Sequence, residues 1–269
     1  MDVKYLIADS GGSSTSWALV YSNNEVKWLQ TRSMHPKYVL ADPEETLKEL
    51  QETFGGLDVP LYFYGAGCAS DEVQNDMQVF LNRAGFSKVE VYPDTLAACR
   101  ALYGKQAGWV GILGTGSILV KYDGNRIVER IGGYGSWVGD EGSGFYFGKL
   151  LARFLLESSE WEDSWTELFG SKARILGKLA GPESQKWLAG LAHQTSGLNF
   201  DFLHRKNALL FWENYGSKIP NPDQIAFIGT YGFEQRIIFE EVFKKQGVTI
   251  LKCLASPMAD LLQFHLVNE

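Results

Sequence analysis

The sequence predicts an α/β protein built from two copies of one topology. Both halves run in the same order: three short strands joined by tight turns, then a helix, a strand, a helix, a strand and a helix. Runs of β-branched and aromatic residues mark the strands, and apolar residues three or four positions apart mark the helices. Strands joined by tight turns pair antiparallel, whereas strands separated by a helix pair in parallel through right-handed crossovers. Each half is therefore expected to form a mixed five-stranded sheet with flanking helices.

The first domain is expected to span residues 1–104 and the second 105–269. In the first, the predicted strands are 4–9, 15–21, 26–32, 61–64 and 88–92, and the predicted helices are 43–54, 71–84 and 95–103. In the second, the predicted strands are 109–113, 117–122, 126–131, 225–228 and 248–252, with helices between 144 and 215, at 233–246 and at 257–265. The extra helices form an insert at about 144–222, which could serve a homodimer or cover a ligand.

The two halves match most closely at their ends. In both, a glycine follows the helix that precedes the last strand, and Gly85 and Gly247 are expected at the C′ position, where the left-handed conformation costs little only for glycine. The helix after that strand opens with Asp94 in the first half and with Ser256 in the second. A difference between the two copies is therefore a candidate for function.

The charge balance favours a soluble protein that handles small molecules. The 25 basic and 32 acidic residues give a net charge of −7, which repels nucleic acid and anionic membranes. Cys68, Cys99 and Cys253 are far apart and odd in number, which indicates neither a disulfide framework nor metal-ligand spacing. The first apolar run is too short for a signal peptide, and no segment approaches the ~18 apolar residues of a membrane span. A cytoplasmic protein without nucleic-acid or membrane partners is expected.

Each half opens with a glycine-rich hairpin. The first is Gly11-Gly12-Ser13-Ser14, and the second is Gly114-Thr115-Gly116. Glycine lets backbone N–H groups approach an anion and hydroxyls add donors, so a pair of such turns could hold the phosphates of a nucleotide. Either turn alone is more simply an ordinary β-hairpin. Their matching positions in the two halves favour phosphate binding.

Two aspartates stand where chemistry is expected. Asp9 ends the first strand and could hold Mg²⁺ through water, although an Asx-type turn is the alternative. Asp94 could cap its helix or act as a base. Since Ser256 would supply a capping oxygen without a charge in the second half, the charge of Asp94 favours a base that takes a proton from a hydroxyl during phosphoryl transfer.

The loop from Gly132 to Gly144 is the most unusual stretch of the chain. It combines six glycines with two aromatic residues and two adjacent acids. Carboxylates and backbone amides beside aromatic faces suit a polyol such as a sugar, because hydroxyls need hydrogen bonds and the apolar face of a sugar needs a ring. The alternative is a mobile surface loop whose acids cap the next helix. The aromatic residues Tyr134 and Trp137 favour the sugar loop.

These motifs carry a resemblance to a known superfamily. The Asp9-x-Gly-Gly-Ser, Gly114-Thr-Gly-Ser and Gly229-Thr-Tyr-Gly turns resemble those of the actin, hexokinase and heat-shock ATPase superfamily. The run from Gly132 to Ser143, with Ser256-Pro257 and Gln263-Phe264-His265, is similar to the N-acetylglucosamine kinases and their BadF/BadG/BcrA/BcrD ATPase relatives. The resemblance implies two ribonuclease H-like domains that face a shared cleft and close on the substrate.

The resemblance also implies roles for particular residues. The turns at Asp9 and Thr115 would bind ATP phosphates and Mg²⁺, with Gly229 and Thr230 near the adenosine and Asp94 as the base. The residues expected to bind sugar are His35, Ser117, Gly133, Tyr134, Gly135, Ser136 and Asp140. His35 stands where relatives carry a sugar-binding asparagine, and an imidazole cannot offer an amide's paired donor and acceptor, so the sugar itself stays open.

The resulting prediction is an ATP-dependent kinase with ATP and Mg²⁺ as cofactors. Its expected substrate is an amino sugar, N-acetylglucosamine or a related N-acetylhexosamine, phosphorylated at a primary hydroxyl. One alternative is an ATPase that activates a dehydratase of the 2-hydroxyacyl-CoA type, which needs cysteines to hold an iron–sulfur cluster. Another is a catalytically silent regulator that binds nucleotide or sugar, against which the presence of both Asp9 and Asp94 argues.

Overall fold

The chain divides into two compact units in the computed structural model, which describes residues 2–55 and 58–268. The first unit comprises Met1–Gly104 together with Pro257–Glu269, and the second comprises Lys105–Ser256. The expected boundary after Gly104 agrees with this division. None of the described helices is long and apolar enough to cross a membrane.

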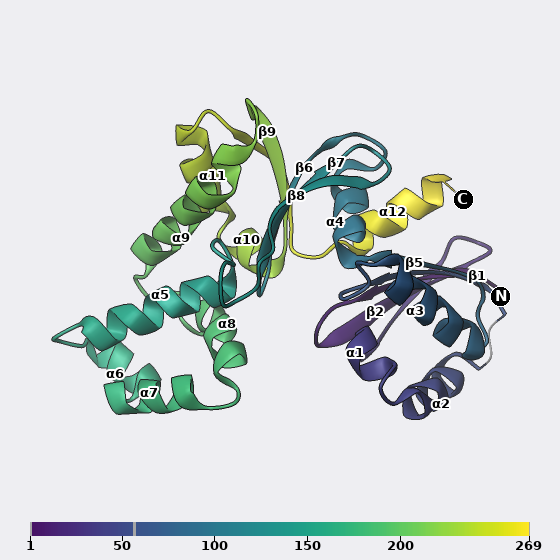
Figure 1. Ribbon diagram of the computed structural model, residues 1–269, viewed down its shortest axis with the longest axis horizontal. Helices are drawn as coiled ribbons and strands as arrows, with labels where there is room; N and C mark the ends of the chain where they lie inside the picture. The colour runs from purple at the N-terminus through teal and green to yellow at the C-terminus, as the bar shows by residue number, and fades with distance from the viewer. Residues whose placement is uncertain (1, 56–57, 269) are drawn as a thin grey trace. The chain divides into compact units, whose positions relative to one another are not determined.

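The last helix departs from the expected domain division. The second domain was expected to include 257–269, but α12 (Met258–Asn268) packs against α4 (Asp94–Tyr103) within the first unit, as Figure 1 shows. Leu261 and Leu262 are buried there in a core with Tyr5 and Ile7 of the first sheet. The apolar face of α12 therefore completes the first unit, although the whole sequence of the second unit separates α12 from α4.

The strands described in the first unit form a mixed sheet in the order β3-β2-β1-β4-β5. They are β1 (Val3–Ser10), β2 (Ser14–Tyr21), β3 (Val26–Arg32), β4 (Pro60–Gly65) and β5 (Ser87–Pro93). β1 pairs antiparallel with β2 and parallel with β4, as the connection lengths predicted. Alternate residues of β1 serve two cores. Leu6 and Ala8 pack with α2 (Pro43–Phe54) and α3 (Asp71–Arg83), while Tyr5 and Ile7 pack with α4 and α12.

The second unit repeats this arrangement. Its described strands form a sheet in the order β10-β9-β6-β7-β8, with β6 antiparallel to β7 and parallel to β9. They are β6 (Gly108–Leu113), β7 (Ser117–Tyr122), β8 (Ile127–Gly132), β9 (Gln224–Ile228) and β10 (Thr249–Leu254). The expected duplication of a mixed five-stranded sheet is confirmed for the described residues.

The helices agree with expectation apart from two details. The insert consists of α5 (Gly144–Glu157), α6 (Asp163–Phe169), α7 (Lys172–Ala180), α8 (Ser184–Gln194), α9 (Asp201–Asn214) and the 3₁₀ turn η1 (Gly216–Lys218). The helix expected at 233–246 is two helices, α10 (Thr230–Glu234) and α11 (Arg236–Lys245), and the short helix α1 (Pro36–Val39) was not predicted. Gly85 and Gly247 follow the last residues of α3 and α11 with φ of 107° and 79°, so both are C′ glycines.

Close contact between α5 and α8 depends on a glycine. A Cβ added at Gly148 of α5 would lie 2.1 Å from the backbone oxygen of Leu188 on α8, so no side chain fits there without moving the backbone. Gly177 of α7, by contrast, has no atom within 4 Å of an added Cβ. The two helical glycines offer a matched pair for the same substitution.

Substituting each of these glycines with alanine is expected to change stability in opposite directions. Gly148→Ala should lower the free energy of unfolding by roughly 1–3 kcal/mol, because the helices must separate. Gly177→Ala should raise it by about 0.5–1 kcal/mol, because alanine loses less backbone entropy within a helix. Urea unfolding followed by circular dichroism measures both changes. Equal effects at the two positions would contradict the close approach of α5 and α8.

Candidate active site

Asp9 and Asp94 lie at the same edge of the first sheet. In the parallel strands β1, β4 and β5, Ser10 pairs with Gly65 and Gly65 pairs with Pro93, so the three strands end together. Asp9 is the penultimate residue of β1, and Asp94 follows β5 as the first residue of α4. Asp9 follows Tyr5 and Ile7 at the two-residue spacing of a strand, so its side chain lies on the same face of β1 as theirs, the face that packs against α4. The two carboxylates therefore share one edge and one face.

The two carboxylates interact electrostatically. Burial and, to a smaller extent, the negative charge of Asp94 together raise the pKa of Asp9 to about 7. Oδ1 of Asp94 accepts a hydrogen bond of 2.8 Å from the backbone N–H of Thr95. Partly buried carboxylates that repel each other form a place where a divalent cation relieves the repulsion. The residues present therefore fit Mg²⁺ at Asp9.

The expected caps of the two matching helices are wrong. Pro93, with φ −68° and ψ 147°, is the N-cap of α4, which makes Asp94 the first helical residue. In the second copy α12 begins at Met258, and the backbone N–H of Leu261 donates to the carbonyl of Pro257, so Ser256 lies before the cap. A proline directly precedes each helix, so Asp94 lies one residue inside α4 and Ser256 lies one residue before Pro257. Asp94 must therefore be judged by its own surroundings rather than by comparison with Ser256.

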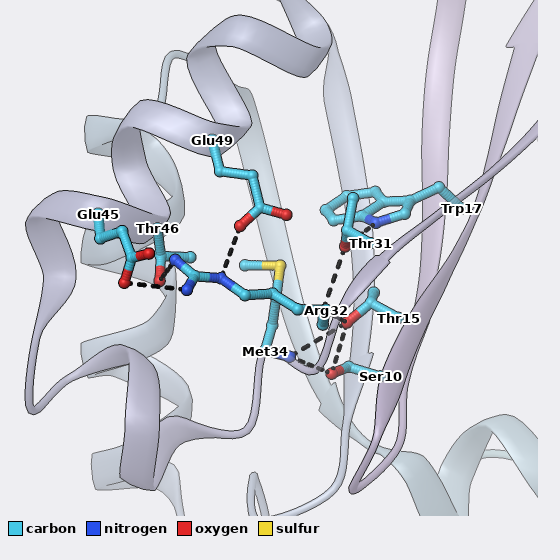
Figure 2. A network of polar contacts seen from close by, with 9 residues as sticks. All are labelled: Ser10, Thr15, Trp17, Thr31, Arg32, Met34, Glu45, Thr46 and Glu49. Carbon is cyan, nitrogen blue, oxygen red and sulfur yellow. Dashed lines mark hydrogen bonds and ion pairs between the residues drawn. The ribbon is translucent and has the colours of Figure 1, made fainter.

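Hydrogen bonds beneath the first glycine-rich turn hold it in place. Gly11, Gly12 and Ser13 are exposed, and the N–H of Gly11 donates to the carbonyl of Ser14 at 3.0 Å. Below the turn, the hydroxyl oxygens of Ser10 and Thr15 accept the backbone N–H of Met34 at 3.0 and 3.1 Å, as Figure 2 shows. The turn therefore presents exposed backbone N–H groups on a fixed support.

An ion-pair cluster holds the end of β3, from which the chain continues to Met34 beneath this turn. Arg32, the last residue of β3, lies 3.1 Å from the carboxylate of Glu45 and 2.6 Å from that of Glu49, both on α2, and bonds the hydroxyl of Thr46 at 2.9 Å (Figure 2). Hydrogen bonds to both carboxylates raise the pKa of Arg32. Since these side chains are largely exposed, the cluster serves mainly to direct the chain from β3 toward α1.

His35 has a defined position beside the same sheet edge. It is the N-cap of α1, and its Nδ1 accepts the backbone N–H of Lys37 at 3.2 Å. In the neutral ring the proton then belongs on Nε2. The Nε2 edge packs on Gly67, where an added Cβ would lie 2.8 Å from the ring, in the turn after β4. His35 is thus held next to the strand between Asp9 and Asp94.

Four of the residues expected to bind nucleotide meet in the second unit. Gly114, Thr115, Gly229 and Thr230 line one cavity of about 420 Å³. The cavity wall is completed by Gly144, Ala189, Ala192, His193, Tyr231, Glu234 and Ala255. Gly229 has φ 121°, and a Cβ there would lie 2.5 Å from the carbonyl oxygen of Leu113, so the close approach of β6 to α10 requires glycine.

The second glycine-rich turn is fixed from beneath by α5. The backbone N–H of Gly144 donates to the carbonyl of Gly114 at 2.9 Å, and that of Phe145 donates to the carbonyl of Thr115 at 3.3 Å. A Cβ at Gly116 would meet Oδ1 of Asp140 at 3.1 Å. The carbonyls of the turn therefore point into the protein.

Asp140 and Ser117 are brought together, as expected for two residues of one pocket. Oδ1 of Asp140 accepts the backbone N–H of Ser117 at 3.1 Å, and the Ser117 hydroxyl donates to the carbonyl of Glu141 at 2.6 Å. Burial raises the pKa of Asp140, while the N–H of Ser117 lowers it in part. These bonds fix the position of the Asp140 carboxylate beneath the second glycine-rich turn.

The glycine-rich loop itself is open. Tyr134 is 61% exposed and Trp137 is 90% exposed within this chain, and Gly133 and Gly135 have φ of 70° and 77°. The hydroxyl of Ser136 accepts a hydrogen bond of 3.2 Å from the amide of Gln185 on α8, which joins the loop to the insert. Sugar binding by Gly133, Tyr134, Gly135 and Ser136 stays a prediction, as does sugar binding by His35.

Sequence reasoning missed the residues that hold this loop from inside. Asn207 on α9 is fully buried, and its amide bonds the backbone of both Gly142 and Ser143. Tyr231 and His204 extend the same cluster, and burial lowers the pKa of His204 to about 4. A lone asparagine within a helical pattern carries no signal for such a role, because an exposed asparagine gives the same pattern.

Comparison with solved structures finds the same fold in several proteins. A protein provisionally named as an N-acetylglucosamine kinase, from Porphyromonas gingivalis, matches with a TM-score of 0.82 at 29% identity, over 98% of this chain and 99% of that chain. A second, from Chromobacterium violaceum, matches with a TM-score of 0.71 at 19% identity, over 98% and 99%. A ROK family glucokinase from Streptomyces griseus, solved with glucose and AMPPNP, matches with 0.52 at 15% identity, over 98% of each chain.

These likenesses confirm the expected fold. No protein-family model matches the chain, and no curated protein matches it. The chain nevertheless has the duplicated α/β fold seen in sugar kinases and actin-like ATPases. At the level of the fold, the resemblance described from the sequence is thereby confirmed.

The buried imidazole of His204 predicts a loss of stability in acid. Its pKa is about 4 in the folded chain and about 6.5 in the unfolded chain, so the unfolded state binds more protons between these values and stability falls as the pH is lowered. From pH 7 to pH 4.5 this group should remove about 2 kcal/mol. Asparagine at this position offers an oxygen to Tyr231 but does not titrate. Over the same pH range His204→Asn should therefore lose about 2 kcal/mol less stability than the parent protein.

Urea unfolding of both proteins at the two pH values measures this difference. His193→Gln on α8 is the control, because it removes a histidine whose side chain is 85% exposed rather than buried. If His204→Asn loses as much stability in acid as the parent protein, His204 is not the buried neutral group described here.

Proposed function

We propose that this chain, which has the duplicated fold of the actin-like ATPases, is an ATP-dependent sugar kinase. Its proposed substrate is an amino sugar, N-acetylglucosamine or a related N-acetylhexosamine, phosphorylated at a primary hydroxyl. The observation that carries the proposal is the pair of carboxylates at one sheet edge, where Asp94 raises the pKa of Asp9. A phosphotransferase also agrees with the sugar kinases among the similar structures.

In the proposed reaction Asp94 is the base. It accepts the proton of the sugar hydroxyl while the hydroxyl oxygen bonds to the γ-phosphorus of ATP, and the bond from that phosphorus to the bridging oxygen of ADP breaks. In a loose phosphoryl-transfer transition state the base mainly orients the hydroxyl and takes its proton late. A strongly basic carboxylate is therefore unnecessary, and the bond from the Thr95 N–H fixes the direction of the Asp94 oxygen.

Asp9 would hold Mg²⁺ through water. Bound there, the ion would neutralise charge on the ATP phosphates. Asp9 itself contributes a carboxylate that the protein keeps at a strand end next to the exposed turn of Gly11, Gly12, Ser13 and Ser14. In this proposal the backbone N–H groups of Gly12 and Ser13 in that turn donate to phosphate oxygens.

The cavity of the second unit would receive the nucleotide. The turn of Gly114, Thr115 and Gly116 would bind the phosphates, and Gly229 and Thr230 would lie near the adenosine. The volume of about 420 Å³ and the small residues Gly144, Ala189 and Ala192 in its wall are suited to a planar base with its ribose. The hydroxyl and carboxylate groups of Ser117 and Asp140, with the loop from Gly133 to Ser136 and His35, would contact the sugar.

A dehydratase-activating ATPase is disfavoured by the cysteines. Such a protein would need thiolates that can reach a shared cluster. Cys68 and Cys99 are buried in the first unit, and burial together with the charge of Asp94 raises the pKa of Cys68 to about 12. A protonated thiol in a packed core is a poor iron ligand.

An assay of ADP release tests the proposed activity. The purified chain with ATP and Mg²⁺ is presented with hexoses, N-acetylhexosamines, glucosamine and muramic sugars. We expect N-acetylhexosamines to stimulate ADP formation most strongly, because the proposed pocket combines carboxylate, amide and aromatic groups. If no sugar stimulates ADP formation, the proposed kinase activity is wrong.

Replacing the proposed base tests its role. Asp94→Asn is expected to lower turnover by roughly 10²–10⁴-fold, because proton transfer to a positioned base contributes about that much, while nucleotide binding is retained. Asp71→Asn is the matched control, since Asp71 is likewise the first residue of a helix in the first unit, α3, but is exposed. Turnover of Asp94→Asn equal to that of the control would rule out Asp94 as the base.

A further inference from the structure

A chain of buried hydrogen bonds joins the cavity wall of the second unit to the loop that carries Asp140. Oδ1 of Asn207 accepts the backbone N–H of Gly142 at 2.8 Å, and Nδ2 lies 2.9 Å from the carbonyl of Ser143 and 3.0 Å from the hydroxyl of Tyr231. The Tyr231 hydroxyl lies 3.0 Å from Nδ1 of His204. The side-chain amide of Asn207 therefore bonds both the loop at Gly142 and Ser143 and the cavity-wall residue Tyr231.

The direction of each bond follows from the donors available. The Asn207 amide has two N–H groups, which it donates to Ser143 and Tyr231, so the Tyr231 hydroxyl donates onward to Nδ1 of His204. Nδ1 can accept only in a neutral ring, which agrees with the lowered pKa of His204. His204 is held by its stacking on Phe147, with ring centroids 3.8 Å apart. The chain of bonds therefore has one consistent arrangement.

Both ends of this chain reach groups proposed to bind ligands. Tyr231 lines the 420 Å³ cavity and follows Gly229 and Thr230 directly. At the other end, Gly142 lies two residues after Asp140, whose carboxylate bonds Ser117 at the base of the phosphate turn. Asn207 itself lines neither place: it is fully buried on α9.

We propose that Asn207 is a positioning residue that couples nucleotide binding in the cavity to the conformation of the Asp140 loop. This inference rests on the proposed nucleotide site. A nucleotide that restrains Tyr231 also restrains the Asn207 amide, because a shift of either leaves a buried donor unpaired. The restrained amide then fixes the N–H of Gly142 and, through the chain, the carboxylate of Asp140.

Hydrogen exchange of the loop amides tests the coupling without requiring catalysis. The probe is AMPPNP with Mg²⁺, and the measured quantity is the ratio of exchange rates at 140–143 with and without it. In the parent protein we expect nucleotide to slow exchange by about tenfold, within the usual range for coupled sites. AMPPNP affinity is measured on the same samples by calorimetry.

Two variants separate positioning from folding. Tyr231→Phe keeps the bonds of Asn207 to Gly142 and Ser143, so exchange without nucleotide should stay near that of the parent protein, while the slowing by AMPPNP should fall below about twofold. Asn207→Ala should lose both the basal protection and the slowing. Asn214→Ala is the matched control, because Asn214 lies on the same helix and donates to the carbonyl of Leu210 of that helix.

The outcomes are distinguishable. Loss of the slowing in Tyr231→Phe, with AMPPNP bound and Asn214→Ala unchanged, supports the coupling. AMPPNP binding that leaves loop exchange unchanged in the parent protein, or full slowing in Tyr231→Phe, overturns the coupling but not the nucleotide site. If AMPPNP does not bind the parent protein, the proposed function and the coupling both fail.

Discussion

Parallel pairing of β1, β4 and β5 is the constraint on which the candidate active site depends. Because parallel strands end at the same edge of a sheet, Asp9 and Asp94 meet although 84 residues separate them in the sequence. The same edge receives His35 through the turn after β4. Helix packing on one face then places Asp94 over the side of β1 to which Asp9 belongs. The repulsion between the carboxylates is a direct product of the strand order.

The second unit has the same strand order, but different residues lie at the end of its first strand. Its first strand ends in a glycine turn instead of an aspartate, and a glycine at the start of α10 lets the two backbones approach closely. Glycines and small residues make up much of the wall of this cavity, together with Glu234 and His193, while two aspartates mark the edge of the first sheet. Two copies of one topology thus offer chemically different edges.

Much of the fold was predictable because strand lengths, turns and helix-ending glycines act locally. Gly85 and Gly247 are examples, since the C′ position selects glycine whatever surrounds it. The place of α12 was not predictable in this way, because its apolar face could be buried in either unit. For the site, the glycine turns and Asp9 were readable from their positions. Asn207 was not, because only tertiary packing shows which buried groups its amide satisfies.

The return of α12 to the first unit has a consequence for synthesis. During translation the N-terminal residues emerge first, and domains commonly fold as they appear. Here the core formed by Tyr5 and Ile7 lacks Leu261 and Leu262 until the whole second unit has left the ribosome. The second unit can therefore close its own core first, while the core on one face of the first sheet is completed last. A nascent chain thus leaves Tyr5 and Ile7 without the cover of α12 until the end of synthesis.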